Sequence, residues 1–193
     1  MNGGAGFEIK SVELKHAGWT RLLLTTIRLP DGKIIRREIE DHGTAVAVFP
    51  FDPMRRTAIL VRQFRAPVFY ASKQDQMTEC IAGILEEADP IAGARREALE
   101  EAGIPLRSLD HVARVWTMPG ISTERMDLYL AAYDDAPRVK DGLGAAAEDE
   151  HIAVVETGLG ELAQMAEAGQ ITDMKTLLLL QTLRLRHSAL FNA

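Results

Sequence analysis

Cysteine is almost absent from this sequence, which contains one, Cys80, among its 193 residues. A single thiol cannot close an intramolecular disulfide, so the fold depends on its core, and a cytoplasmic location is expected. Cys80 is followed by the apolar residues Ile81 and Ala82, which favours a packed thiol over a nucleophile. The five histidines are scattered at no metal-ligand spacing and give no support for a zinc site or a Ser-His pair.

Long hydrophobic runs and an excess of positive charge are also missing. The longest apolar stretch, residues 177–180, is far too short to cross a bilayer, and the first ten residues have no signal-like apolar run, so no membrane partner is expected. The 22 basic and 28 acidic residues give a formal net charge of -6, which argues against nucleic acid as a partner. An anionic substrate would therefore need local help from metal ions and a few arginines.

The order of the expected elements indicates an α/β protein. Strands rich in aliphatic and β-branched residues are predicted at 7–14, 20–29, 33–40, 44–49, 57–64, 111–118, 124–133 and 151–156, with a hairpin turn at 30–32. Helices are predicted at 159–168 and 173–187, in addition to a central helix described next. A β-rich chain with one central and two terminal helices suits a mixed sheet enclosed by helices.

The central helix carries three carboxylates within reach of one another. Glu97, Glu100 and Glu101 are spaced i, i+3 and i+4, which places them on one face. Such an arrangement destabilises a helix unless a cation lies nearby. Arg95 and Arg96 offer partial compensation, but a bound Mg²⁺ or Mn²⁺ offers more. The alternative interpretation is a solvated charged face, which is common on helices.

The surroundings of these glutamates favour the metal site. An irregular stretch with Gly83 and Pro90 precedes the helix, and Gly103 ends it. Within the helix, three alanines are spaced i, i+4 and i+8: Ala94, Ala98 and Ala102. These small residues would let the helix press onto a sheet while the glutamates face outward.

Residues 82–104 resemble the Nudix box, G-x5-E-x7-R-E-U-x-E-E-x-G-U, in which U is aliphatic. The second half of the box is matched by Arg96, Glu97, Ala98, Glu100, Glu101, Gly103 and Ile104. Counted from Gly83, Asp89 takes the acidic position of the loop in place of Glu, and six residues instead of seven separate it from Arg96. The loop is thus one residue short, and the role of Asp89 stays open.

The resemblance extends along most of the chain. QFR at 63–65, AG at 82–83, MPGISTE at 118–124, AEDEHI at 147–152 and DMKTLLLL at 173–180 follow the order of the Nudix branch that cleaves ADP-ribose and GDP-mannose, and look most like GDP-mannose pyrophosphatase. The resemblance implies a Nudix-type α/β/α sandwich with a mixed sheet. Residues 1–43 would form an N-terminal β extension, and residues 44–193 the Nudix hydrolase domain.

The resemblance also implies a metal site and its ligands. Mg²⁺, with Mn²⁺ possible, would be held by the Glu97 and Glu101 carboxylates, by the backbone carbonyl of Ala82 and by Glu150. Glu100 would share metals or waters beside them, and Arg96 would orient the glutamates. Glu148 falls where ADP-ribose enzymes place their proposed general base, so either Glu148 or Glu150 does the proton work.

Substrate contacts are implied outside the box. Arg65 would bind the diphosphate, because a guanidinium binds phosphate as a fork. Glu124 would contact substrate or close the metal site, and Lys175 would reach the sugar phosphate. The extension would cross to a partner subunit in a homodimer with exchanged N-terminal strands and help to bind the nucleotide through Arg36, Arg37 and Glu38.

The expected function is Mg²⁺-dependent hydrolysis of the diphosphate of a nucleoside diphosphate sugar. GDP-mannose, giving GMP and mannose 1-phosphate, is the first-choice substrate, and ADP-ribose or another ADP-sugar is the alternative. A function of another class is a non-catalytic Nudix domain that binds or senses a nucleotide. Such domains usually lose box carboxylates, whereas Glu97, Glu100 and Glu101 are all present here.

Overall fold

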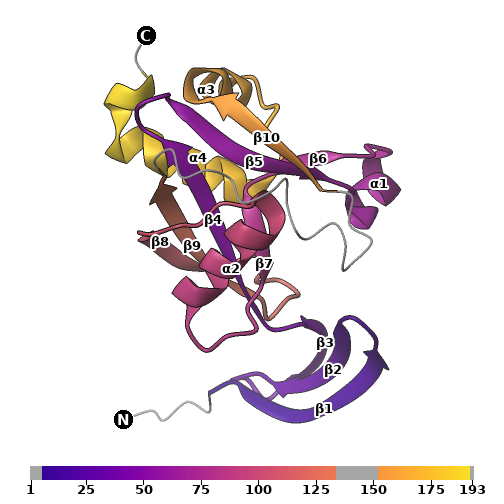
Figure 1. Cartoon of the computed structure of the whole chain (residues 1–193). Coiled ribbons are helices and arrows are strands. Elements are labelled where there is room, and N and C mark those ends of the chain that lie inside the picture. Colours follow the sequence, from indigo (N-terminus) through magenta and orange to yellow (C-terminus); the bar gives the residue numbers. More distant parts are fainter. Residues whose placement is uncertain (1–5, 134–151, 192–193) are drawn as a thin grey trace. The chain divides into compact units, whose positions relative to one another are not determined.

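The computed structural model describes residues 6–133 and 152–191 (Figure 1). The chain divides into two compact units, each described by itself below. The first comprises Met1–Thr44 and Val115–Met126, and the second comprises Ala45–Arg114 and Asp127–Ala193.

The first unit contains a three-stranded antiparallel sheet in the order β1-β2-β3. Its strands are β1 (Glu8–Ala17), β2 (Arg21–Arg28) and β3 (Ile34–Asp41). The predicted hairpin between the last two is confirmed, with the Gly32 N–H donating to the Leu29 carbonyl at 2.9 Å and a positive φ of 85° that favours glycine. β1 is exposed along its whole length.

The second sheet has seven strands in the path β10-β5-β4-β9-β8, with β6 added to β5 and β7 added to β4. Their bounds are β4 (Thr44–Asp52), β5 (Thr57–Gln63), β6 (Met77–Glu79), β7 (Ile81–Ile84), β8 (Asp110–Trp116), β9 (Arg125–Ala132) and β10 (Ala153–Gly158). β4 is buried on both faces after its first residue, as expected for a central strand with a nearly continuous apolar sequence.

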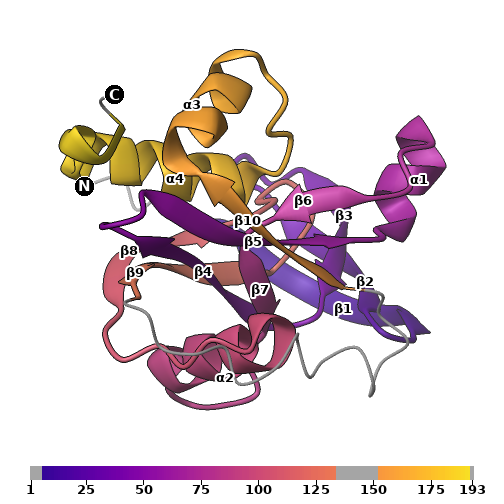
Figure 2. The same ribbon diagram turned by 45° about the horizontal axis from the view of Figure 1, so that its top comes forward.

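Helices cover both faces of this sheet. Figures 1 and 2 show α2 (Pro90–Ala102) on one side, and α3 (Leu159–Glu167) and α4 (Met174–Arg186) on the other. On the α2 side, the three alanines of the helix pack on alternating residues of three strands: Val46, Val48, Ile59, Val61 and Ile81. On the opposite side, Leu60 lines a small cavity together with residues of α3 and α4.

Several short elements were not predicted. α1 (Ala66–Ser72) buries none of its residues, so it leaves no apolar periodicity in the sequence. The stretch around Gly83, expected to be irregular, contains β7 instead, because residues 81–84 pair with β4. A 3₁₀ turn (Ser188–Phe191) follows α4. Within the described ranges, no helix is long and apolar enough to cross a membrane.

Candidate active site

Helix α2 is fixed at both ends by its own sequence. The Asp89 carboxylate accepts a hydrogen bond of 3.0 Å from the Ile91 N–H, and Pro90 occupies the first turn. At the other end, Gly103 adopts a left-handed φ of 67°, and its N–H donates to the Leu99 carbonyl at 3.0 Å. Asp89, whose role the sequence left open, therefore caps this helix.

The alanine stripe presses α2 onto the sheet and carries two glutamates inward with it. Ala94, Ala98 and Ala102 are fully buried, as predicted. The expectation that the glutamates face outward is wrong for Glu97 and Glu101, which are 8% and 7% exposed. Close packing of the helix explains this, because both side chains leave the helix beside strand β7.

Two successive residues of β7 touch these buried carboxylates. The Ala82 N–H donates to Glu101 Oε2 at 3.3 Å. A Cβ on Gly83 would lie 2.0 Å from Glu97 Oε1, so only glycine leaves room for that carboxylate. Strand β7 thus explains why the box begins with glycine, since its backbone is the wall against which the metal-ligand candidates rest.

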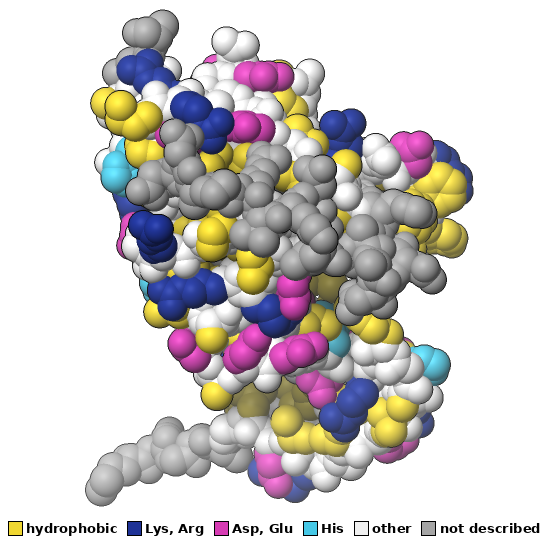
Figure 3. Space-filling model, in the orientation of Figure 1, with side chains coloured by type: hydrophobic (Ala, Val, Ile, Leu, Met, Phe, Trp, Pro, Cys, Tyr) yellow, Lys and Arg dark blue, Asp and Glu magenta, His cyan; other side chains and the backbone are white. Residues whose placement is uncertain are grey.

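Arg96 holds three carboxylates at once. Its guanidinium lies 2.6 Å from Glu87 Oε1, 2.8 Å from Glu97 Oε1 and 2.7 Å from Glu100 Oε2. It also donates to the Ile84 carbonyl at 3.1 Å. The predicted orienting role of Arg96 agrees with these contacts. Figure 3 shows acidic and basic side chains side by side over the part of the second unit that carries α2.

Glu87 and Arg95 differ from the expectation. Glu87 was missed, although an acid in the box loop within reach of an arginine was a usable signal. Arg95, expected to compensate the glutamates, instead donates to the Arg107 carbonyl at 2.7 Å.

The electrostatics of this cluster favour an added cation. Burial raises the pKa of Glu97, and the charges of Glu100 and Glu87 add to the effect, whereas Arg96 opposes it. Glu87 Oε2 is buried with no hydrogen-bond partner among the described residues. A hard divalent ion such as Mg²⁺ suits these oxygen donors, so the residues fit the implied metal.

A complete metal cage is not formed by the described residues alone, because no three His, Cys, Asp or Glu side chains among them converge on one point. Glu148 and Glu150, the residues predicted to add a further ligand and a base, lie outside the described residues.

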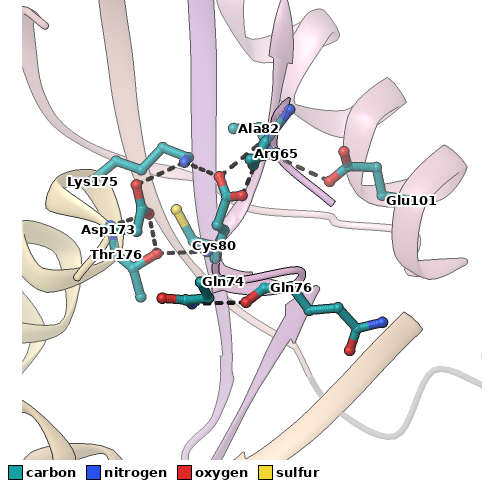
Figure 4. Close-up of polar contacts among 10 residues, drawn as sticks. Arg65, Gln74, Gln76, Cys80, Ala82, Glu101, Asp173, Lys175 and Thr176 are labelled. Atoms are coloured by element: carbon teal, nitrogen blue, oxygen red, sulfur yellow. Dashed lines mark hydrogen bonds and ion pairs between the residues drawn. The ribbon is translucent and has the colours of Figure 1, made fainter. Parts of the chain in front are cut away.

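A second ionic cluster surrounds Glu79, which sequence reasoning missed. Arg65 forms a two-pronged ion pair with it, Nε to Oε1 at 2.8 Å and Nη2 to Oε2 at 3.2 Å. Lys175 Nζ lies 2.5 Å from Glu79 Oε2 and 2.9 Å from Asp173 Oδ1 (Figure 4). The predicted substrate contacts Arg65 and Lys175, far apart in sequence, therefore meet at one carboxylate. A lone acid before an apolar stretch was the only signal for it.

The cations around Glu79 determine its charge state. Burial alone would raise the pKa of this carboxyl group, but the Arg65 hydrogen bonds and the Lys175 charge outweigh it and leave the pKa below its ordinary value. The Glu79 side chain is 3% exposed, that of Lys175 14% and that of Arg65 36%. Arg65 is thus the more accessible of the two predicted cations.

Cys80, the next residue, is a packed thiol as predicted. Its side chain is buried, and burial raises its pKa to about 12, which leaves no thiolate near neutral pH. Its backbone N–H donates to Thr176 Oγ1 at 2.6 Å.

A family model described as NUDIX domain matches residues 41–178. This chain belongs to the Nudix family. The family predicted from the box is confirmed, and with it the assignment of the chain as a Nudix hydrolase.

Relatives of this Nudix hydrolase are named GDP-mannose pyrophosphatase. The protein from Cronobacter sakazakii is 38% identical over 159 residues, 81% of this chain and 82% of its own. The proteins from Salmonella arizonae and Escherichia coli O1:K1 are 35% and 33% identical over 160 residues, 81% of this chain and 83% of theirs. The crystal structure of an ADP compounds hydrolase matches with a TM-score of 0.77 over 98% of both chains at 16% identity. The predicted α/β Nudix fold with a mixed sheet is therefore confirmed.

The remaining predicted residues of this Nudix hydrolase lie in the first unit. Arg36, Arg37 and Glu38 are exposed on β3. Glu124 Oε2 lies 3.6 Å from His42 Nδ1, and the His42 ring stacks on Trp19 with centroids 5.2 Å apart. The box carboxylates, Arg65 and Lys175 belong to the second unit.

Proposed function

We propose that this Nudix hydrolase cleaves the diphosphate of a nucleoside diphosphate sugar in an Mg²⁺-dependent reaction, with GDP-mannose as first-choice substrate and GMP and mannose 1-phosphate as products. The observation that carries the proposal is the pair of buried carboxylates, Glu97 and Glu101, resting against Ala82 and Gly83 of β7. The names of the relatives at 33–38% identity support the substrate.

In this proposal Glu97, Glu101 and the Ala82 carbonyl hold the metal. When bound, Mg²⁺ or Mn²⁺ neutralises diphosphate charge and activates water for attack on phosphorus. Arg96 keeps Glu97 in place through its 2.8 Å contact. The Glu100 side chain is 45% exposed and so can share a metal or its waters from the solvent side.

The acidic loop supplies the remaining groups in the proposal. Glu150 is proposed as a further metal ligand, and either Glu148 or Glu150 as the general base that removes the proton of the attacking water. A base from outside the helix is needed because Glu97 and Glu101 are assigned to the metal.

Substrate binding is assigned to cations and polar groups outside the box. Arg65 would bind the diphosphate as a fork, and Lys175 the sugar phosphate. Glu124 would close the site. The exposed set on β3 would bind the nucleotide: Arg36, Arg37 and Glu38.

We propose a cytoplasmic location for this enzyme and a homodimer as its working form. β1 and the residue before it expose large apolar side chains, which a second copy with exchanged N-terminal strands would cover: Phe7, Ile9, Val12 and Leu14. Residues of β3 would then be shared between two subunits.

The test compares GDP-mannose and ADP-ribose side by side with Mg²⁺, Mn²⁺ or EDTA, with products resolved by chromatography. We expect GMP and mannose 1-phosphate from GDP-mannose, and no turnover in EDTA. Faster cleavage of ADP-ribose would move the substrate to the ADP-sugars. Binding of either nucleotide in a calorimeter, with both left intact, would favour a non-catalytic sensor.

A further inference from the structure

Glu79 is a buried acid with no part in the reaction outlined above. It lies at the end of β6, its side chain is 3% exposed, and it contacts Arg65 and Lys175. Burying a carboxylate this deeply is costly unless cations and hydrogen bonds compensate it. An apolar residue could fill the same space without this desolvation cost, so the carboxylate points to a role beyond packing.

We propose that Glu79 is a positioning residue that orients the guanidinium of Arg65 for the diphosphate of the substrate. This inference rests on the proposed function and deepens it. Arg65 follows β5 and stands at the N-cap of α1, where its backbone is extended and its side chain makes no capping hydrogen bond to the helix. The two-pronged pair at 2.8 and 3.2 Å fixes the plane of the guanidinium.

The burial of the cluster gives it a direction. Glu79 is its innermost member, whereas the Arg65 side chain is 36% exposed. Lys175 bridges Glu79 and Asp173, so among the described residues two carboxylates are matched by two cations. A cluster without net charge is cheaper to bury, and its exposed member is the one that suits an anion.

Glu79 also ties this cation to the box. Only Cys80 separates it from β7, whose residues Ala82 and Gly83 touch Glu101 and Glu97. The Cys80 N–H is held by Thr176 of α4 at 2.6 Å. One short segment therefore fixes both the arginine and the wall of the metal site, which keeps their spacing constant.

The test is a double-mutant cycle on substrate binding. GDP-mannose is titrated in a calorimeter in EDTA, where no turnover is expected, into the wild-type protein, Glu79→Gln, Arg65→Ala and the double variant. Each single change should weaken binding about tenfold or more, because charge-assisted hydrogen bonds are lost or misdirected. The double variant should bind within about twofold of Arg65→Ala, because Glu79 acts through Arg65.

Two further variants separate positioning from mere stability. Glu156→Gln makes the same change in another arginine-paired carboxylate, 2.9 Å from Arg55, and should leave binding within about twofold of wild type. Arg65→Lys keeps the charge but not the fork, and should lose nearly as much as Arg65→Ala. If Glu79→Gln fails to fold, Arg65→Lys still tests whether binding needs the two-pronged contact to Glu79 or only a positive charge at this position.

The outcomes are distinct. If Glu79→Gln weakens binding equally in both backgrounds, or if Arg65→Lys binds like wild type, positioning is overturned. Absence of wild-type binding overturns it too. If the wild-type protein binds GDP-mannose with the expected cycle but never hydrolyses it with Mg²⁺, the proposed function fails and the role of Glu79 stands.

Discussion

The two ionic clusters next to β7 solve the problem of buried charge in opposite ways. Around Glu79, counting described residues only, two carboxylates meet two cations, and each carboxylate is paired. Around Arg96, three carboxylates share a single guanidinium. Within the part of the chain that the structure describes, the charges of the first cluster balance, whereas the second has more negative charge than its arginine can balance.

The pKa directions follow this difference. The pKa of Glu97 is raised, chiefly by burial, whereas the pKa of Glu79 is lowered because its cations overcome a similar burial. A bound metal ion would offset the cost of keeping the buried Glu97 carboxylate charged. Glu79 is already compensated by Arg65 and Lys175, so an added cation would stabilise it little. Catalytic chemistry is therefore expected at the cluster whose charge is unbalanced, and a positioning role at the cluster whose charge is balanced.

The largest expected effect is loss of a metal ligand from the unbalanced cluster. Glu101→Gln keeps the size of the side chain and removes its charge, so turnover of GDP-mannose should fall by more than about a hundredfold. Loss of a direct metal ligand is expected to cost more than loss of a residue that only supports a ligand. The fold should remain, because the Gln side chain still accepts from the Ala82 N–H. Steady-state kinetics and thermal unfolding check both parts.

Glu161→Gln is the matched control, since Glu161 is an exposed acid in the first turn of α3. It should leave turnover within about twofold of wild type. Near-normal activity of Glu101→Gln beside it would remove Glu101 from the metal site and end the contrast between the clusters.

A smaller effect is expected from filling the space beside Glu97. In Gly83→Ala the new Cβ would lie 2.0 Å from Glu97 Oε1, so the carboxylate must move. We expect about a tenfold to hundredfold loss of kcat/KM, because misplacement by about 1 Å is costly in a preorganised site. Stability should change less, since the displaced group is the end of a flexible side chain.

Gly160→Ala provides the control for Gly83→Ala. A Cβ on Gly160, in the first turn of α3, meets nothing within 4 Å. This change should keep full activity and add up to about 1 kcal/mol of stability. If Gly83→Ala is equally active, the close approach of Glu97 to β7 has no part in catalysis.

The long elements and the box could be predicted because their signals are local. Richness in aliphatic and β-branched residues predicted most of the strands, and the i, i+4, i+8 alanines correctly indicated the face of α2 that packs on the sheet. The hairpin at 30–32 followed from turn chemistry, which involves only neighbouring residues.

What could not be predicted depends on distant contacts. The role proposed for Glu79 depends on its ion pairs with Arg65 and Lys175. The pairing of β6 with β5 brings Arg65 to it, and the start of α4 brings Lys175. The burial of Glu97 and Glu101 depends on how closely α2 approaches β7, which side-chain spacing alone does not determine. α1 buries nothing and so left no pattern.

The smallest expected effect is a change in the free energy of unfolding at low pH, which arises from the balanced cluster around Glu79. The folded-state pKa of Glu79 lies below the ordinary value of 4.5. Its charge therefore contributes stability at pH values above 4.5, and this contribution is lost as the pH falls through the lowered folded-state pKa. At neutral pH we estimate it at about 1 to 3 kcal/mol, as for charge-assisted hydrogen bonds of a buried group.

Glu79→Gln should thus be less stable than wild type at pH 7 by that amount, and the difference should shrink below pH 4.5. Urea unfolding at steps from pH 7 to pH 3 measures it. Cys80→Ala alters the same segment, but the thiol pKa of about 12 keeps it neutral throughout, so its difference from wild type should not vary with pH. A constant difference for Glu79→Gln would mean that its cations do not stabilise its charge, and the two clusters would then be alike.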